Sequence, residues 1–159
     1  MTDRSIIVAD GDMDRLTRLV RALKYSLFRD PQQVELLDQT LESADVRPLG
    51  RVPRDVIRMN SRVRVLDLDA RQKELYTLVF PEEANISRGL ISVLAPIGIA
   101  LLGHRQGDVV EARVPGGTRM LRVEQVRPGT EVAKRKPSED KPVRRTRHPG
   151  RTHQTVLVA

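Results

Sequence analysis

The sequence predicts an α+β fold: a short N-terminal antiparallel helical hairpin, an antiparallel β domain with one short helix, and a disordered tail. Three observations support this prediction. Apolar residues recur at helical spacing before residue 45, and strand-like segments separated by turn residues occupy 61–126. Beyond Pro128, apolar residues become rare. Helical and strand patterns in separate stretches of a chain are typical of α+β proteins.

The first predicted helix follows a short β-branched arm, 6–8, which we expect to pack against another element. Asp10 or Asp12 supplies the N-cap oxygen. The apolar positions that follow are Met13, Leu16, Leu19, Val20, Leu23 and Leu27. Basic residues occupy the opposite face, so the pattern predicts an amphipathic helix with one buried side.

The second predicted helix begins with Asp30 as its N-cap and Pro31 as its first residue, because the N–H that proline lacks would be unpaired there. Its apolar positions are Val34, Leu37, Leu41 and Ala44. Each helix spans about 15 residues, or about 22 Å. Helices this short are marginal alone, so we expect the hairpin to depend on its own seam and on packing against the β domain.

The β domain is predicted from five strand-like segments, 61–68, 75–80, 90–94, 109–114 and 118–126. Pro115 and two glycines give a tight turn between the last two segments. Between the third and fourth, Pro96 opens a helical turn that Gly103 ends. The predicted divisions are the arm and hairpin (1–48), a linker (49–53), the β domain (54–128) and the tail (129–159).

Composition restricts the functional classes. The 159 residues include no cysteine, which removes disulfides, thiol catalysis and cysteine zinc sites. No apolar run approaches the roughly 18–20 residues of a membrane span, and the first ten residues lack a basic signal-peptide start. We expect a cytoplasmic protein that does not bind membranes.

The sequence offers no recognisable catalytic or metal centre. His104, His148 and His153 form no ligand pair at helical spacing, and we expect His104 to face solvent in a loop. Ser92 lacks the frame of a nucleophile elbow, and the glycine pair before Thr118 lacks the lysine of a P-loop. We therefore predict a non-enzymatic protein without a metal or a cofactor.

Three blocks of sequence resemble a known family. The C-terminal domain of the bacterial Gre transcript-cleavage factors is similar to SVLAPIGIALLGHRQGDVVEARVPGG, residues 92–117. The branch of that family formed by the regulators of nucleoside diphosphate kinase (Rnk) resembles PRDVIRMNSRV, residues 53–63, and SIIVADGDMDRL, residues 5–16. The resemblance covers about the first 130 residues and does not include the tail.

This resemblance implies an FKBP-like β domain that docks on RNA polymerase core enzyme at the rim of its secondary channel. The residues that match the family's docking region are Pro81, Glu82, Glu83, Ile86, Ser92, Ala95, Pro96, Ile97 and Gly98. Residues 81–83 lie in a predicted loop, where contact residues are common. Ile97, Leu101 and Leu102 share one short apolar helix, so the alternative that they belong to the core stays open.

In Gre factors, two acidic side chains at the hairpin tip help to hold a metal ion that activates water for RNA cleavage. The predicted tip here, Phe28, Arg29 and Asp30, offers one carboxylate, which lies beside a cation and is assigned as a helix cap. The predicted hairpin is also shorter than a Gre hairpin. The resemblance therefore implies a regulator that competes with Gre factors for polymerase without stimulating cleavage. Its oligomeric state is open.

The alternative function is association with nucleic acid through the tail. The formal net charge of the chain is +7, and residues 128–159 carry eight basic and three acidic side chains. The candidate polyanion-binding residues are Lys134, Arg135, Lys136, Lys141, Arg144, Arg145, Arg147 and Arg151. Few apolar residues accompany them, so we expect disorder from 131 to 154. Only four aromatic residues occur in the chain, which argues against recognition by base stacking.

Deletion of the residues after Thr130 tests this alternative. Binding through the tail should weaken steeply with salt, because basic side chains displace counterions from the phosphates, and should vanish in the truncated chain. Titrations of DNA at several salt concentrations measure both effects. Unchanged binding with an unchanged salt slope would show that the tail is not the binding element.

Overall fold

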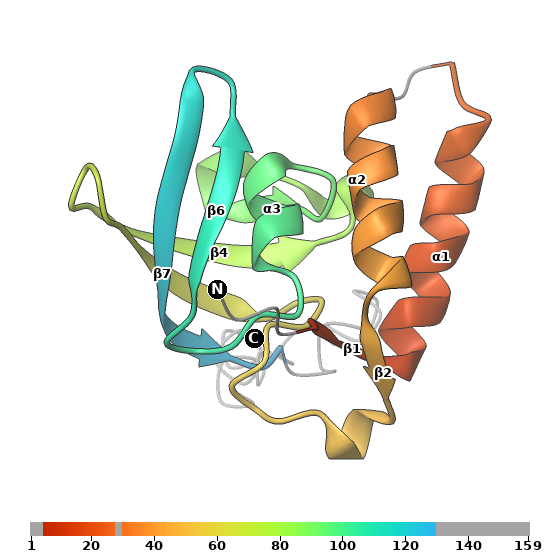
Figure 1. Ribbon diagram of the computed structural model, residues 1–159, viewed down its shortest axis with the longest axis horizontal. Coiled ribbons are helices and arrows are strands. Elements are labelled where there is room, and N and C mark those ends of the chain that lie inside the picture. The colour runs from red at the N-terminus through yellow and green to blue at the C-terminus, as the bar shows by residue number, and fades with distance from the viewer. Residues whose placement is uncertain (1–4, 28–29, 130–159) are drawn as a thin grey trace, which may run out of the picture.

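The computed structural model describes residues 5–27 and 30–129. Within these residues the predicted α+β fold is confirmed: a helical hairpin lies beside a curled five-stranded sheet (Figure 1). Phe28 and Arg29 of the predicted hairpin tip, and the basic residues of the tail within 130–159, lie outside the described residues.

The hairpin consists of α1 (Asp10–Lys24) and α2 (Pro31–Glu42), which pack along the predicted apolar stripes. Its buried side chains are Leu16, Val20, Val34, Leu37 and Leu41. Leu27 lies beyond the end of α1 and is 96% exposed, so the stripe of α1 ends at Leu23, which packs against the core.

The two helices begin differently. Asp30 caps α2 as predicted, because its Oδ1 accepts hydrogen bonds from two amides of the first turn, at 3.1 and 3.5 Å. The predicted cap of α1 by Asp10 or Asp12 is wrong: Ala9 occupies the N-cap position, where a short strand runs directly into the helix. Asp12 instead accepts a hydrogen bond from the amide of Met59 at 3.2 Å and so ties α1 to the β domain.

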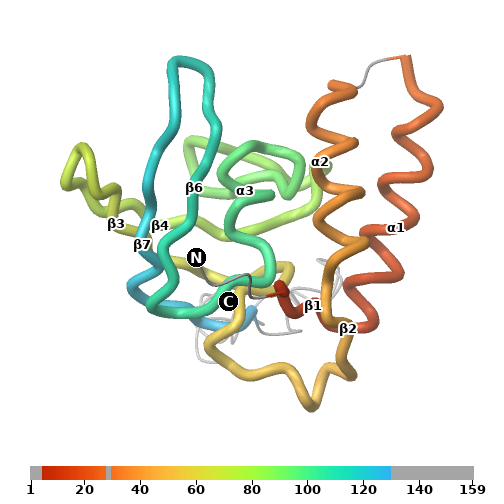
Figure 2. The backbone as a smooth tube through the Cα atoms, in the orientation of Figure 1, coloured from red at the N-terminus to blue at the C-terminus, as the bar shows by residue number. Residues whose placement is uncertain are grey.

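Between the hairpin and the main sheet, β1 (Ile7–Ala9) and β2 (Asp45–Arg47) form a two-stranded parallel sheet (Figure 2). The sequence predicts a packing arm for the first segment and no strand for the second, since three residues between a helix and a linker carry no readable alternation. The amide of Ile7 also donates to the carbonyl oxygen of Gly103 at 3.2 Å. The base of the hairpin is therefore joined to the β domain through backbone groups.

The main sheet has the strand order β5-β4-β3-β7-β6. Its strands are β3 (Arg62–Asp67), β4 (Lys73–Val79), β5 (Leu90–Ser92), β6 (Val109–Val114) and β7 (Gly117–Arg127). The pairs β3–β4, β3–β7 and β6–β7 are antiparallel as predicted.

The edge strand β5 is parallel to β4, so the prediction of a wholly antiparallel sheet is wrong at this edge. The connection between the two strands contains two 3-10 turns, η2 (Pro81–Glu83) and η3 (Ile86–Arg88), which carry the chain back along β4. Gly89 then turns it with a left-handed φ of 72°. A parallel return of this kind depends on the path of the loop, which strand periodicity does not report.

The short helix α3 (Pro96–Leu101) begins at proline as predicted, and Gly103 follows it with a left-handed φ of 76°. The helix packs so closely on the end of β5 that a Cβ at Gly98 would overlap the carbonyl oxygen of Ser92. The buried apolar side chains of this segment are Ile97, Ile99, Leu101 and Leu102. The alternative that this helix belongs to the core is therefore confirmed.

One apolar core extends from the hairpin into the sheet. Its fully buried members include Leu16 and Leu37 of the hairpin, Ile57, Val63 of β3 and Leu121 of β7. At the boundary, the guanidinium carbon of Arg15 lies 4.2 Å from the ring centre of Phe80, in a cation–π contact. The hairpin is thus part of the same folded unit as the sheet.

A cluster of charged side chains spans β3, β4 and β7. Asp67 is buried, and its carboxylate accepts two amide hydrogen bonds from the following turn and one from Nε of Arg119 at 2.7 Å. Arg119 also bonds Glu74 at 2.9 Å, and Glu74 accepts a bond from the hydroxyl of Tyr76 at 2.6 Å. The amide of Ala70, followed by the Arg119 guanidinium, lowers the pKa of Asp67. Sequence pattern alone does not predict this cluster, because its members are distant in the chain.

The close packing at Gly98 predicts that Gly98→Ala destabilises the protein by about 1–3 kcal/mol, because the added methyl group meets backbone that cannot move freely. Gly11→Ala is the matched control in α1, where nothing lies within 4 Å of the new atom. It should leave stability unchanged or raise it by up to about 1 kcal/mol. Urea denaturation measures both variants, and equal effects would contradict the close contact.

Candidate functional site

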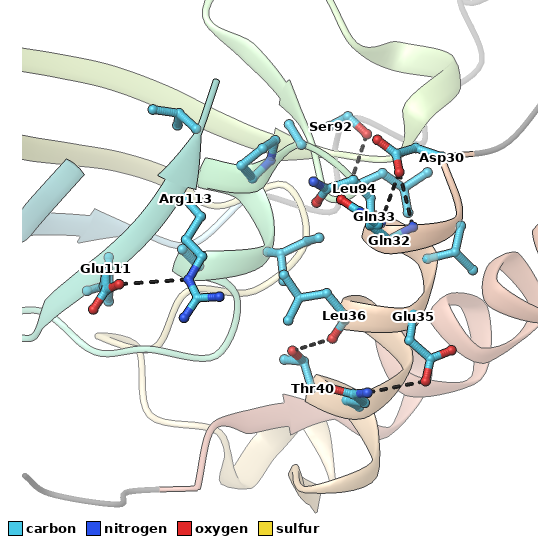
Figure 3. Close-up of a pocket in the computed structure, with 18 of the residues that line it drawn as sticks. Asp30, Gln32, Gln33, Glu35, Leu36, Thr40, Ser92, Leu94, Glu111 and Arg113 are labelled. Carbon is cyan, nitrogen blue, oxygen red and sulfur yellow. Dashed lines mark hydrogen bonds and ion pairs between the residues drawn. The ribbon is translucent and has the colours of Figure 1, made fainter. Parts of the chain in front are cut away.

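A groove of about 1440 Å³ lies between the hairpin and the β domain (Figure 3). Residues of α2 form one wall, and residues of β5, α3 and β6 form the other. The apolar side chains that line it include Leu36, Leu94, Pro96, Ile99 and Val114. Apolar grooves flanked by polar residues are the kind of surface that receives a segment of another protein.

The α2 wall carries an apolar residue outside the buried stripe of its helix. Leu36 is 43% exposed and lines the groove. The hydroxyl of Thr40 donates to the carbonyl oxygen of Leu36 at 2.7 Å, and the side-chain Nε2 of Gln39 donates to the carboxylate of Glu35 at 3.2 Å (Figure 3). Thr40, Gln39 and Glu35 therefore bond within the helix, whereas the buried Oε1 of Gln33 has no hydrogen-bond partner among the described residues. Sequence reasoning misses this wall, although a leucine outside the stripe is a readable signal for it.

The opposite wall is a tight turn between β5 and α3. The hydroxyl of Ser92 accepts a hydrogen bond from the amide of Leu94 at 3.0 Å (Figure 3), and the amide of Ala95 donates to the carbonyl oxygen of Ser92 at 3.0 Å. Pro96 then starts the helix without an N–H to leave unpaired. Local hydrogen bonds thus hold Ser92, Ala95 and Pro96 on the wall of the groove.

The predicted docking residues fall into three groups. Ser92, Ala95 and Pro96 line the groove. Pro81, Glu82, Glu83 and Ile86 lie in η2 and η3, next to β5, where Ile86 is 83% exposed. Ile97 and Gly98 are buried in the core. The second group precedes β5 in the chain and the first begins at its last residue, whereas Ile97 and Gly98 are buried behind the turn that follows β5.

Asp30, which caps α2, also lines the groove. It is the one residue of the predicted tip that the structure describes. Within residues 5–27 and 30–129, no group of three or more histidines and acidic residues is placed to hold a metal ion. Among the same residues, no helix combines the length and apolar character needed to cross a membrane.

His104 contradicts the expectation of a solvent-facing loop residue. It lies at the groove, and its Nδ1 is buried without a hydrogen-bond partner in the described part of the chain. Its backbone carbonyl oxygen accepts a bond from the amide of Ile57 at 2.8 Å, which draws the loop inward. Burial lowers the pKa of His104 from its usual value, and the nearby carboxylate of Asp108 only partly opposes this shift.

Comparison with known proteins identifies the family. Residues 52–128 match the family model described as "Transcription elongation factor, GreA/GreB, C-term". The chain is 34% identical to transcription elongation factor GreA of Rhodospirillum rubrum over 119 residues. These residues make up 75% of each protein. The chain belongs to the Gre/Rnk family of transcription elongation factors.

Two further Gre/Rnk relatives extend the likeness beyond the β domain. The regulator of nucleoside diphosphate kinase of Escherichia coli K12 is 34% identical over 117 residues, which cover 74% of this chain and 84% of that protein. A solved Gre structure, the prokaryotic transcription elongation factor GreA/GreB from Nitrosomonas europaea, is 32% identical and superposes with a TM-score of 0.64. That match covers 79% of this chain and all of the other. The protein is therefore a regulator associated with transcription elongation.

The burial of His104 predicts a pH dependence of stability. Because the folded pKa is lowered, the unfolded chain takes up the proton first as the pH falls below 6.5. The free energy of unfolding should therefore be fully retained above pH 6.5 and should decrease as the pH falls toward the folded pKa. His104→Gln should reduce this decrease in urea denaturation followed across pH, whereas His148→Gln, in the tail, should not. An identical pH profile in all three proteins would contradict the buried neutral histidine.

Proposed function

We propose that this protein binds RNA polymerase core enzyme at the secondary channel and competes there with Gre factors without stimulating transcript cleavage. Membership of the Gre/Rnk family supports a partner in the transcription machinery. The proposal assigns docking to the β domain, 54–128, and places the hairpin of residues 1–48 in the channel.

The surface around β5 supports docking. On one side, Glu82 and Glu83 are exposed and project from a 3-10 turn, and Ile86 is almost fully exposed beside them. On the other side, Pro96 and its neighbours line an apolar groove. A combination of exposed charge and exposed apolar area is what a protein interface requires, because charges steer the encounter and apolar contacts give affinity.

The hairpin supports the absence of cleavage. Its helices have 15 and 12 residues, so the longer one reaches about 22 Å at 1.5 Å per residue. Asp30, the acidic residue of the predicted tip, already accepts two amide hydrogen bonds as a helix cap. A short arm and a carboxylate engaged in capping are poorly suited to completing a metal site in a distant active centre. The capping of Asp30 is the single observation that carries this part of the proposal.

Charge reversal on η2 tests the docking surface. Glu82→Lys with Glu83→Lys should weaken binding to core polymerase at least about tenfold, since two negative charges of the proposed docking surface become positive. The control, Asp55→Lys with Asp69→Lys, makes the same change at positions outside both the hairpin and the surface around β5. Binding is measured by titration of labelled protein with core enzyme, followed by displacement with GreA.

Two results would contradict the proposal. Equal loss of binding in both double variants would show that net charge alone matters. Shortening of the transcript in stalled complexes, on addition of the wild-type protein with Mg²⁺, would show that the capped tip supports cleavage. The expected result is displacement by GreA and transcripts of unchanged length.

A further inference from the structure

The outer face of the main sheet carries four arginines that the proposed polymerase docking does not use. They are Arg62 and Arg64 of β3 and Arg122 and Arg127 of β7, and all four are exposed. Within the described residues none of them makes a hydrogen bond or an ion pair. We call this set the arginine face.

The strand register brings these side chains to one side of the sheet. Arg62 lies directly opposite Arg127, and Arg64 lies opposite Gln125, while the residues that alternate with them are buried valines. Arg122 is opposite Leu66 on the same strand pair, beyond a bulge at Glu124. Cross-strand partners project to the same face. The two central strands of the sheet therefore present a contiguous basic surface.

The fold does not neutralise this charge. The acidic side chain beside these arginines, Glu124, pairs with Lys73 at 3.4 Å. Like charges directly opposite each other destabilise a strand pair, so the placement of Arg62 against Arg127 costs stability.

A shallow hollow of about 650 Å³ gives the face a recess. Arg64 and Arg122 line it, together with Gln106, Gln125 and Glu124, whose carboxylate is paired with Lys73. A guanidinium group offers a planar fork of donors that matches phosphate oxygens. Two unpaired guanidinium groups on one hollow are therefore suited to a phosphate group that approaches from outside.

We propose that the arginine face binds the phosphate backbone of duplex DNA. The described aromatic side chains lie elsewhere: Tyr76 belongs to the cluster around Arg119, Phe80 is buried and Tyr25 is at the end of α1. The face thus lacks a platform for unstacked bases, which favours the backbone of a duplex over a single strand. Binding is independent of base sequence. In Figure 1, β7 and the β3–β4 turn lie away from the hairpin, and the hollow and the groove share no lining residue in the described part of the chain.

The test uses the full chain and a labelled DNA duplex, followed by fluorescence anisotropy between about 50 and 200 mM salt. The sheet variant combines Arg62→Gln, Arg64→Gln, Arg122→Gln and Arg127→Gln. The control variant combines Arg18→Gln, Arg21→Gln, Arg51→Gln and Arg88→Gln, which removes the same charge from exposed positions elsewhere. The sheet variant should lose at least about tenfold in affinity, and its salt slope should fall by about 3.6, which is about 0.9 for each of the four lost phosphate contacts. The control should keep the wild-type slope.

Two further measurements distinguish a loss of DNA contacts from unfolding of the protein and from a loss of polymerase binding. Arg62→Gln alone should raise the temperature of thermal unfolding, because it removes a like-charge pair, while it weakens DNA binding. The sheet variant should still bind core polymerase and be displaced by GreA. Equal loss of DNA affinity in both quadruple variants would overturn the proposal, as would unchanged DNA binding with lost polymerase binding. Complete loss of DNA binding on removal of the tail alone would overturn it as well.

Discussion

The structure depends on the apolar core that the helical hairpin shares with the β domain. Helices of 15 and 12 residues are marginal in isolation, so their stability comes from the faces they bury. Leu16 and Leu37 are fully buried in the core that contains Val63 and Leu121 of the sheet. Each such leucine contributes about 1.5–3 kcal/mol through its removal from water. Without this core, neither the hairpin nor the groove beside it would have a fixed shape.

The surfaces assigned to function follow from that core. The groove has a fixed shape because α2 and the turn before α3 both pack on that core. The position of the hairpin depends on the contacts that hold its base. Three polar contacts define that base: the amide of Met59 bonds Asp12, the amide of Ile7 bonds the carbonyl of Gly103, and Arg15 covers Phe80. The outer face of the sheet stays free of the helices and keeps its unpaired arginines. A rigid body with two separate surfaces can engage two partners at once.

Features that depend on neighbouring residues were predictable from the sequence. Asp30 with Pro31 marks the start of a helix, Pro96 and Gly103 bracket another, and alternating valines mark β3, because capping and side-chain alternation act within a few residues. Features that depend on distant residues were not. The parallel return of β5, the pairing of β2 with β1 and the burial of His104 are decided by contacts across the chain. The polymerase-binding residues came from family resemblance, whereas the groove, Leu36 and the arginine face required the structure.

Native-state hydrogen exchange at the amides of α1 and β3 tests most directly whether the hairpin and the sheet form one unit. The account predicts that the amides of Val20 and Val65, both buried, open with the same free energy and that this value equals the global free energy of unfolding. If the hairpin amides open with a much lower free energy than the sheet amides, the account is contradicted, because the hairpin would then unfold independently of the sheet.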